Sequence, residues 1–144
     1  APSMTTGDLH GVLSELGAAL IVEALQTLDQ LAPVAQPDRG ALYAEKINKS
    51  EARIDWKMPA SDVQRLIHGL SPFPGAWCEI SGERVKILRA KTIAEDGEPG
   101  EVLDGFKVAC GDGAIEVLEA QRSGKRAMNS DEILRGLTLP ARID

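Results

Sequence analysis

Residues 76–93 carry the strongest structural signal in the chain and read Ala76-Trp77-Cys78-Glu79-Ile80-Ser81-Gly82-Glu83-Arg84-Val85-Lys86-Ile87-Leu88-Arg89-Ala90-Lys91-Thr92-Ile93. Two runs of alternating apolar and polar residues, 76–80 and 84–93, flank a Ser-Gly-Glu turn, which is typical of a β-hairpin. The alternation changes phase after Ile87. A single bulge near Ile87–Leu88 would place all the basic side chains of this strand on its outer face. The simpler alternative is a strand that ends near Leu88.

Short strand signals continue toward the C-terminus. Residues 101–103 predict a short strand, and residues 106–110 and 114–120 flank the turn sequence Gly111-Asp112-Gly113. Five antiparallel strands within about 50 residues predict a small OB-like barrel, a fold that commonly binds tRNA or single strands. Asn129 and Glu132 form a capping pattern that predicts a helix over about 130–136.

The N-terminal third has a different pattern. Helical spacing of apolar residues, with Thr5 and Asp8 as a capping box, predicts a helix over residues 6–31. Residues 32–50 contain Pro33, Pro37 and Gly40 and are expected to be a connector. A second helix is expected over residues 60–70. The fold class is therefore mainly β with flanking helices (α+β), in which a helix and a connector precede the barrel.

The distribution of charge is more informative than its sum. The chain has 144 residues and a net charge of −6, but all 16 Lys and Arg residues lie in residues 38–144. Residues 83–91 and 121–126 are locally basic, and such patches can bind phosphates even on an acidic protein. The alternative is a solvated strand face. No apolar run approaches the roughly 18 residues of a membrane span, and no signal peptide is recognised. The two cysteines, which form no C-x-x-C pair, make a reducing cytoplasm the expected compartment.

No catalytic, cofactor-binding or metal-binding residues are predicted. His10 and His68 are expected on the surfaces of separate helices, and no hydrolase, zinc-protease or nucleotide-loop motif is present. Cys78 and Cys110 form no zinc-type pair and are expected to be buried. Trp56 and Trp77 could stack on bases, but core positions are favoured for both.

Several strings resemble the methionyl-tRNA formyltransferase family. Residues 43–56, Tyr-Ala-Glu-Lys-Ile-Asn-Lys-Ser-Glu-Ala-Arg-Ile-Asp-Trp, are similar to its linker signature. Residues 71–76, Ser-Pro-Phe-Pro-Gly-Ala, resemble its Asn-Pro-Trp-Pro-Gly-Ala loop, with Ser71 and Phe73 substituted. Gly111-Asp112-Gly113, residues 124–128 and the opening 4–10 also match in the expected order, whereas Arg122-Ser123 departs from the Pro-Ala that often precedes the family's Gly-Lys.

The resemblance implies a function for an intact protein. That protein would transfer a formyl group from 10-formyltetrahydrofolate to the amine of initiator methionyl-tRNA, and would be monomeric, with no DNA or membrane partner. Its Rossmann-like N-terminal domain would hold the folate and the catalytic residues, whose motifs do not occur here. Residues 1–31 would then be the last helix of the catalytic domain, 32–50 the interdomain linker and 51–144 the OB-like tRNA-binding domain. This chain would be a C-terminal fragment without catalytic activity or a cofactor of its own.

The resemblance and the basic patches together predict the residues that bind tRNA. They are Lys46, Lys49, Arg53, Arg84, Lys86, Arg89, Lys91, Lys125 and Arg126. Two alternatives stay open. One is the barrel of a metabolic formyltransferase or of a formyltetrahydrofolate hydrolase-type enzyme, and the other is a non-enzymatic RNA-binding OB module.

Overall fold

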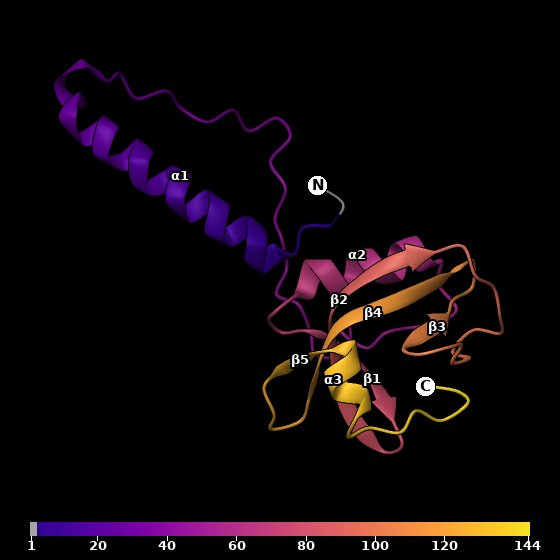
Figure 1. Cartoon of the computed structure of the whole chain (residues 1–144). Coiled ribbons are helices and arrows are strands. Elements are labelled where there is room, and N and C mark those ends of the chain that lie inside the picture. The colour runs from indigo at the N-terminus through magenta and orange to yellow at the C-terminus, as the bar shows by residue number, and fades with distance from the viewer. Residues whose placement is uncertain (1–2) are drawn as a thin grey trace.

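The computed structural model describes residues 3–144, so the first two residues of the expected 1–31 segment lie outside the described part (Figure 1). In chain order the elements are α1 (Thr6–Gln26), the 3₁₀ turn η1 (Leu28–Gln30), α2 (Ala60–Leu70), β1 (Ala76–Ile80), β2 (Glu83–Ile93), β3 (Lys107–Ala109), β4 (Ala114–Arg122), β5 (Ala127–Asn129) and α3 (Ser130–Leu134). The strands form one antiparallel sheet in the order β1-β2-β4-β3, with β5 paired to β4. The sheet curls into a half-barrel against which α2 packs, so the predicted fold class is confirmed.

The predicted bulge in the long strand is present. The pairing of β2 with β4 shifts register between Ile87 and Ala90, where Leu88 is buried beside Ile87. The hairpin before it turns through Ser81 and Gly82, both with positive φ (52° and 79°), which matches the right-handed twist of the flanking strands. The bulge restores the inward orientation of the apolar residues and leaves the basic ones outside. The alternative of a strand ending at Leu88 is wrong.

One strand prediction is wrong in its details, and one short strand was not predicted. Residues 101–103 form only isolated bridges, because Glu101 pairs with Arg142 while Val102 pairs with Val108. Two different partners for neighbouring residues cannot build a ladder. Strand β5 was not predicted, since three residues are too few to show a period of two.

The core lies between the concave face of the sheet and α2. Val63, Ile67 and Leu70 of α2 are buried there, as the helical spacing predicted. Trp56, Cys78 and Cys110 are also buried, as expected. Trp77 is only half-buried and packs at the edge of the core.

His68 corrects a prediction. It was expected on the helix surface, but it is 6% exposed, and its Nε2 accepts a hydrogen bond of 3.3 Å from the backbone N–H of Ala90. It therefore joins α2 to the bulged region of β2. His10 is exposed on α1, as predicted.

Helix α1 leaves the barrel at its first turn and stands away from it (Figure 1). Its predicted capping box is present, with Thr5 as the N-cap and Asp8 returning the hydrogen bond. The helix ends at Gln26, earlier than predicted, and the 3₁₀ turn Leu28–Gln30 follows. No residue of α1 is buried, although the helix is rich in Leu, Ile and Val. Residues 31–50 contain no helix or strand and run back to the barrel.

Candidate nucleic-acid interface

The segment that follows the connector, residues 51–54, is fixed to the edge of the sheet beside β1. The backbone N–H of Ile54 donates to the carbonyl of Trp77, and the N–H of Trp77 donates to the carbonyl of Ala52, both at 2.8 Å. The indole Nε1 of Trp77 also donates to the carbonyl of Lys49 at 3.4 Å. These contacts bring the basic residues near the end of the connector next to the β1–β2 hairpin.

Two guanidinium groups lie close to the ring of Trp77. The Cζ of Arg84 is 4.1 Å from the ring centroid and that of Arg53 is 5.6 Å. Both distances are within the range of cation–π attraction, which orients a guanidinium without neutralising it. Arg53, which follows the connector, and Arg84 of β2 are therefore held near one aromatic side chain with their charges intact.

Lys86 is oriented by the adjacent loop, residues 71–75. Gly75 has a positive φ of 84°, and a Cβ built on it would lie 2.8 Å from Cδ of Lys86. The lysine stem thus crosses the position that a side chain at residue 75 would occupy. Its ammonium group reaches 6.0 Å from the ring centroid of Phe73.

These groups meet at an open pocket of about 380 Å³, lined by Lys49, Phe73, Pro74, Arg84, Lys86, Gln121, Arg122, Ser123 and Gly124. Three of the predicted tRNA-binding residues, Lys49, Arg84 and Lys86, share this pocket. Phe73 had no predicted role, although its place in a loop with two prolines is visible in the sequence. Arg122 is fixed by a bidentate ion pair with Glu83 and by the carbonyl of Gly136.

The other predicted residues differ in their environments. Arg89 pairs with Asp8 at 2.8 Å, Lys91 with Glu116 at 2.9 Å, and Arg126 with Glu132. Lys46 and Lys125 are exposed. Because the three pairs are solvent-accessible, each cation can still exchange its carboxylate for a phosphate, but at the cost of that pair.

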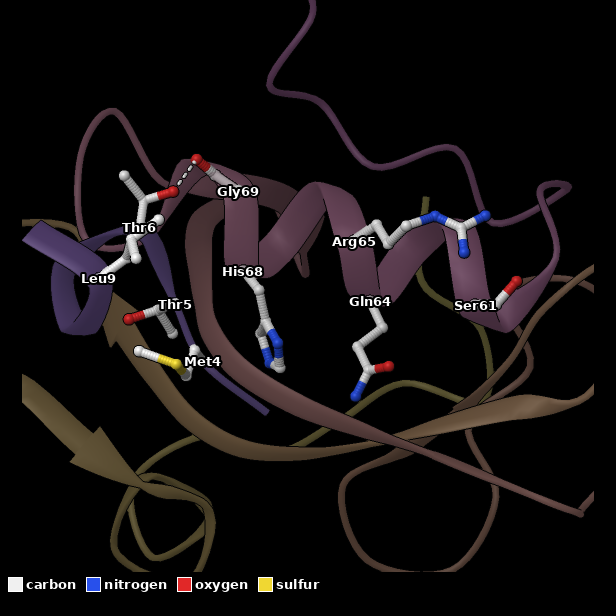
Figure 2. Close-up of a pocket in the computed structure, with 9 residues that line it drawn as sticks. All are labelled: Met4, Thr5, Thr6, Leu9, Ser61, Gln64, Arg65, His68 and Gly69. Carbon is white, nitrogen blue, oxygen red and sulfur yellow. Dashed lines mark hydrogen bonds between the residues drawn. The ribbon is translucent and has the colours of Figure 1, made fainter. Parts of the chain in front are cut away.

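A second pocket, of about 530 Å³, lies where the first turn of α1 meets α2 (Figure 2). The side chains of His68 and Gln64 point from α2 toward β2, where Gln64 donates to the carbonyl of Ala90. At the end of α2 next to His68, the hydroxyl of Thr6 donates to the carbonyl of Gly69 at 2.7 Å. The polar groups of this pocket therefore join α1, α2 and β2.

The buried thiols are not nucleophiles. Burial raises the pKa of Cys78 to about 12 and that of Cys110 to about 11, so both stay protonated at neutral pH. Within residues 3–144 no cluster of three or more His, Cys, Asp or Glu side chains could hold a metal ion. In the same range no helix is both long and apolar enough to cross a membrane.

Comparison with known proteins connects this geometry to a family. Residues 46–138 match the family described as formyl transferase, C-terminal domain. The methionyl-tRNA formyltransferases of Paracoccus denitrificans and Dinoroseobacter shibae are 62% and 59% identical, each over 140 residues that make up 97% of this chain. The chain spans 47% of the length of each of these two relatives.

Solved structures share the fold at lower identity. A variant of HypX from Aquifex aeolicus superposes with a TM-score of 0.73 at 20% identity, covering 96% of this chain and 28% of that one. HypX in complex with tetrahydrofolic acid gives a TM-score of 0.64 at 23% identity, covering 83% of this chain and 23% of that one. At these identities the likeness concerns the fold alone.

Proposed function

Because the chain belongs to the formyl transferase C-terminal domain family, we propose that it is the tRNA-binding part of a methionyl-tRNA formyltransferase. The intact enzyme would transfer a formyl group from 10-formyltetrahydrofolate to the amino group of initiator methionyl-tRNA in the cytoplasm. The folate and the acyl transfer would belong to a separate catalytic domain. The residues described here would hold the tRNA, and holding a substrate in the correct orientation lowers the barrier of the reaction itself.

The observation that carries this proposal is the pocket at the β1–β2 hairpin. It brings Lys49, from the connector, together with Arg84 and Lys86 of the barrel, although these residues are far apart in sequence. Arg84 is held by an aromatic ring rather than by a carboxylate, so its charge is available to a phosphate. A surface that collects cations around an open pocket suits the backbone of a nucleic acid.

The nine proposed residues divide into two groups. Lys46, Lys49, Arg53, Arg84, Lys86 and Lys125 form no ion pair within 4.0 Å among the described residues, and they would be the primary phosphate contacts. Arg89, Lys91 and Arg126 would contribute less, because each already neutralises a carboxylate.

The proposed domain boundaries agree with a separation between a catalytic domain and a tRNA-binding domain. The exposed leucines of α1 are suited to packing against a catalytic domain, so residues 1–31 would belong to that domain. Residues 32–50 would be the linker and residues 51–144 the tRNA-binding domain. A metabolic formyltransferase barrel is the alternative. The names of the two relatives described above, both methionyl-tRNA formyltransferases, favour the tRNA-binding function.

The test is the salt dependence of tRNA binding. If about four phosphates are contacted, the logarithm of the association constant should fall with the logarithm of salt concentration at a slope of about −3 to −4. The double variant Arg84→Ala/Lys86→Ala should reduce that slope by almost two units. It should also weaken binding to different tRNA sequences to a similar degree, because phosphate contacts carry little base information.

A charge-matched control is Arg65→Ala/Lys107→Ala, which removes two cations that do not line the pocket. Each of these is paired with a carboxylate, Asp62 and Glu95 respectively. The control should leave the slope almost unchanged. An Arg84/Lys86 double variant that stays folded and binds tRNA as tightly as the parent would overturn the proposed surface.

A further inference from the structure

Phe73 has an exposure that packing does not explain. Its side chain is 83% exposed, whereas Trp56 and Phe106 are buried in the core. Tyr43 is also exposed, but it lies in the extended connector and lines neither of the two pockets described above. Phe73 instead lies between Pro72 and Pro74, whose rings restrict the backbone of the loop. A large apolar ring is thus held in solvent by a segment with little conformational freedom.

The surroundings of Phe73 are cationic rather than apolar. The ammonium group of Lys86 lies 6.0 Å from the ring centroid, and Lys49 and Arg84 line the same pocket. Trp77, the neighbouring aromatic residue, has guanidinium groups of Arg53 and Arg84 at its ring, so its faces are less accessible to a ligand. Phe73 is therefore the ring of this pocket that can receive a flat partner.

We propose that Phe73 stacks on an unpaired base of the bound tRNA, while Lys49, Arg84 and Lys86 contact the phosphates next to that base. This inference rests on the proposed function and adds to it a contact with a base. Aromatic rings within a positively charged groove are the usual means by which proteins bind single-stranded nucleic acid. An apolar protein segment would suit the pocket less well, because covering it would bury three cations without partners.

The experiment compares Phe73→Ala, Phe73→Leu and Phe73→Trp with the parent chain, using tRNA, a short single-stranded oligoribonucleotide and a blunt-ended RNA duplex as probes. Leucine keeps apolar volume but lacks an aromatic face, so both Phe73→Ala and Phe73→Leu should weaken binding of tRNA and of the single strand at least about fivefold. Duplex binding should stay unchanged. The salt slope should also stay unchanged, because phenylalanine carries no charge.

The Phe73→Trp variant gives an independent signal. It should bind tRNA at least as tightly as the parent, and its added tryptophan fluorescence should be quenched when RNA binds. Circular dichroism checks that each variant is folded, which the exposure of residue 73 favours.

The outcomes separate this inference from the proposed function. If the parent binds tRNA with a salt-dependent affinity but Phe73→Ala and Phe73→Leu bind equally well, the stacking inference is wrong and the phosphate surface stands. If both variants weaken binding to the duplex as much as to the single strand, Phe73 does not stack on an unpaired base. If the parent does not bind tRNA at all, the proposed function itself fails.

Discussion

At the scale of single residues, the position of Lys86 depends on a neighbour that has no side chain. Gly75 combines a positive φ with a close approach to the lysine stem, and either feature alone disfavours another residue. Lys86 then lies over the loop rather than extending freely into solvent. The direction of Lys86, one of the proposed phosphate contacts, is thus set by a glycine that need not touch the ligand.

Replacing Gly75 with alanine should affect both stability and binding. The positive φ should lower the free energy of unfolding by about 1–2 kcal/mol, and the new methyl group should displace Lys86 and weaken tRNA binding. Gly82→Ala is the matched control, because Gly82 also has a positive φ (79°) but a methyl group there would meet no atom within 4 Å. Denaturant unfolding should show a similar loss for both variants, whereas only Gly75→Ala should lose affinity. Equal affinities for the two variants would contradict this account of Lys86.

Residue-level predictions from sequence succeed where the immediate neighbours determine the outcome. The burial of Cys78 and the orientation of Lys86 follow from alternation along a strand. The burial of His68 and the ion pair of Arg89 were not predicted, because their partners are distant in sequence: the backbone of Ala90 for the imidazole and Asp8 for the guanidinium. A helical or strand period shows which face a residue occupies, but not which other segment covers that face.

At the scale of elements, the attachment of α1 depends on its first turn. The N–H of Gly7 donates to the carbonyl of Ser71 at 3.0 Å, and Asp8 accepts two hydrogen bonds from Nη2 of Arg89, at 3.1 and 2.8 Å. A Cβ on Gly7 would lie 2.8 Å from Cδ of Pro72, so the helix approaches the proline loop closely. The same carboxylate of Asp8 therefore caps the helix and binds it to β2.

Removing the charge of Asp8 should loosen this attachment. The backbone N–H of Thr5 and then Arg89 lower the pKa of Asp8 from 3.8 to about 2. A lowered pKa means that the ionised carboxylate stabilises the folded form, so its contribution is present above about pH 4 and is lost as the pH falls toward 2. The Asp8→Asn variant should show faster amide exchange in residues 6–10 and no such pH dependence, whereas β2 and β4 should stay protected.

Glu15→Gln is the control, since it removes the same charge from an exposed position further along α1. Its exchange pattern should match that of the parent. Protection of the first turn that is unchanged in Asp8→Asn would show that the ion pair with Arg89 does not hold the helix.

Elements were predicted well when they were long and periodic. The phase inversion after Ile87 was sufficient to predict the bulge in β2, because a side chain that changes faces requires an extra residue. The bridges at residues 101–102 and the three-residue β5 depend on partners brought in by the rest of the fold. The pocket around Phe73 was missed for the same reason, since it joins the connector, the proline loop and two strands.

At the scale of the whole molecule, the chain is a curled sheet with a projecting helix, and we propose that the sheet side binds tRNA. We expect it to give no formyl-methionyl-tRNA above background when it is mixed with methionyl-tRNA and 10-formyltetrahydrofolate. We expect it instead to compete for tRNA with a full-length methionyl-tRNA formyltransferase, raising the apparent KM for tRNA without changing kcat. The Arg84→Ala/Lys86→Ala chain should compete less well. Product formed by the chain alone would show that the chain itself contains the catalytic groups.

The length of the projecting helix turns a small rotation at its first turn into a large displacement of its far end. At 1.5 Å per residue, the 21 residues of α1 extend about 31 Å. A rotation of about 10° at the first turn would therefore move its far end by about 5 Å. The segment that returns to the barrel, residues 31–50, could span up to about 65 Å when extended. It is therefore long enough to permit this displacement of the helix end. The orientation, relative to the sheet, of any domain that packs on α1 is accordingly set at the first turn of the helix. The contacts that set it are Gly7 against Pro72 and Asp8 against Arg89.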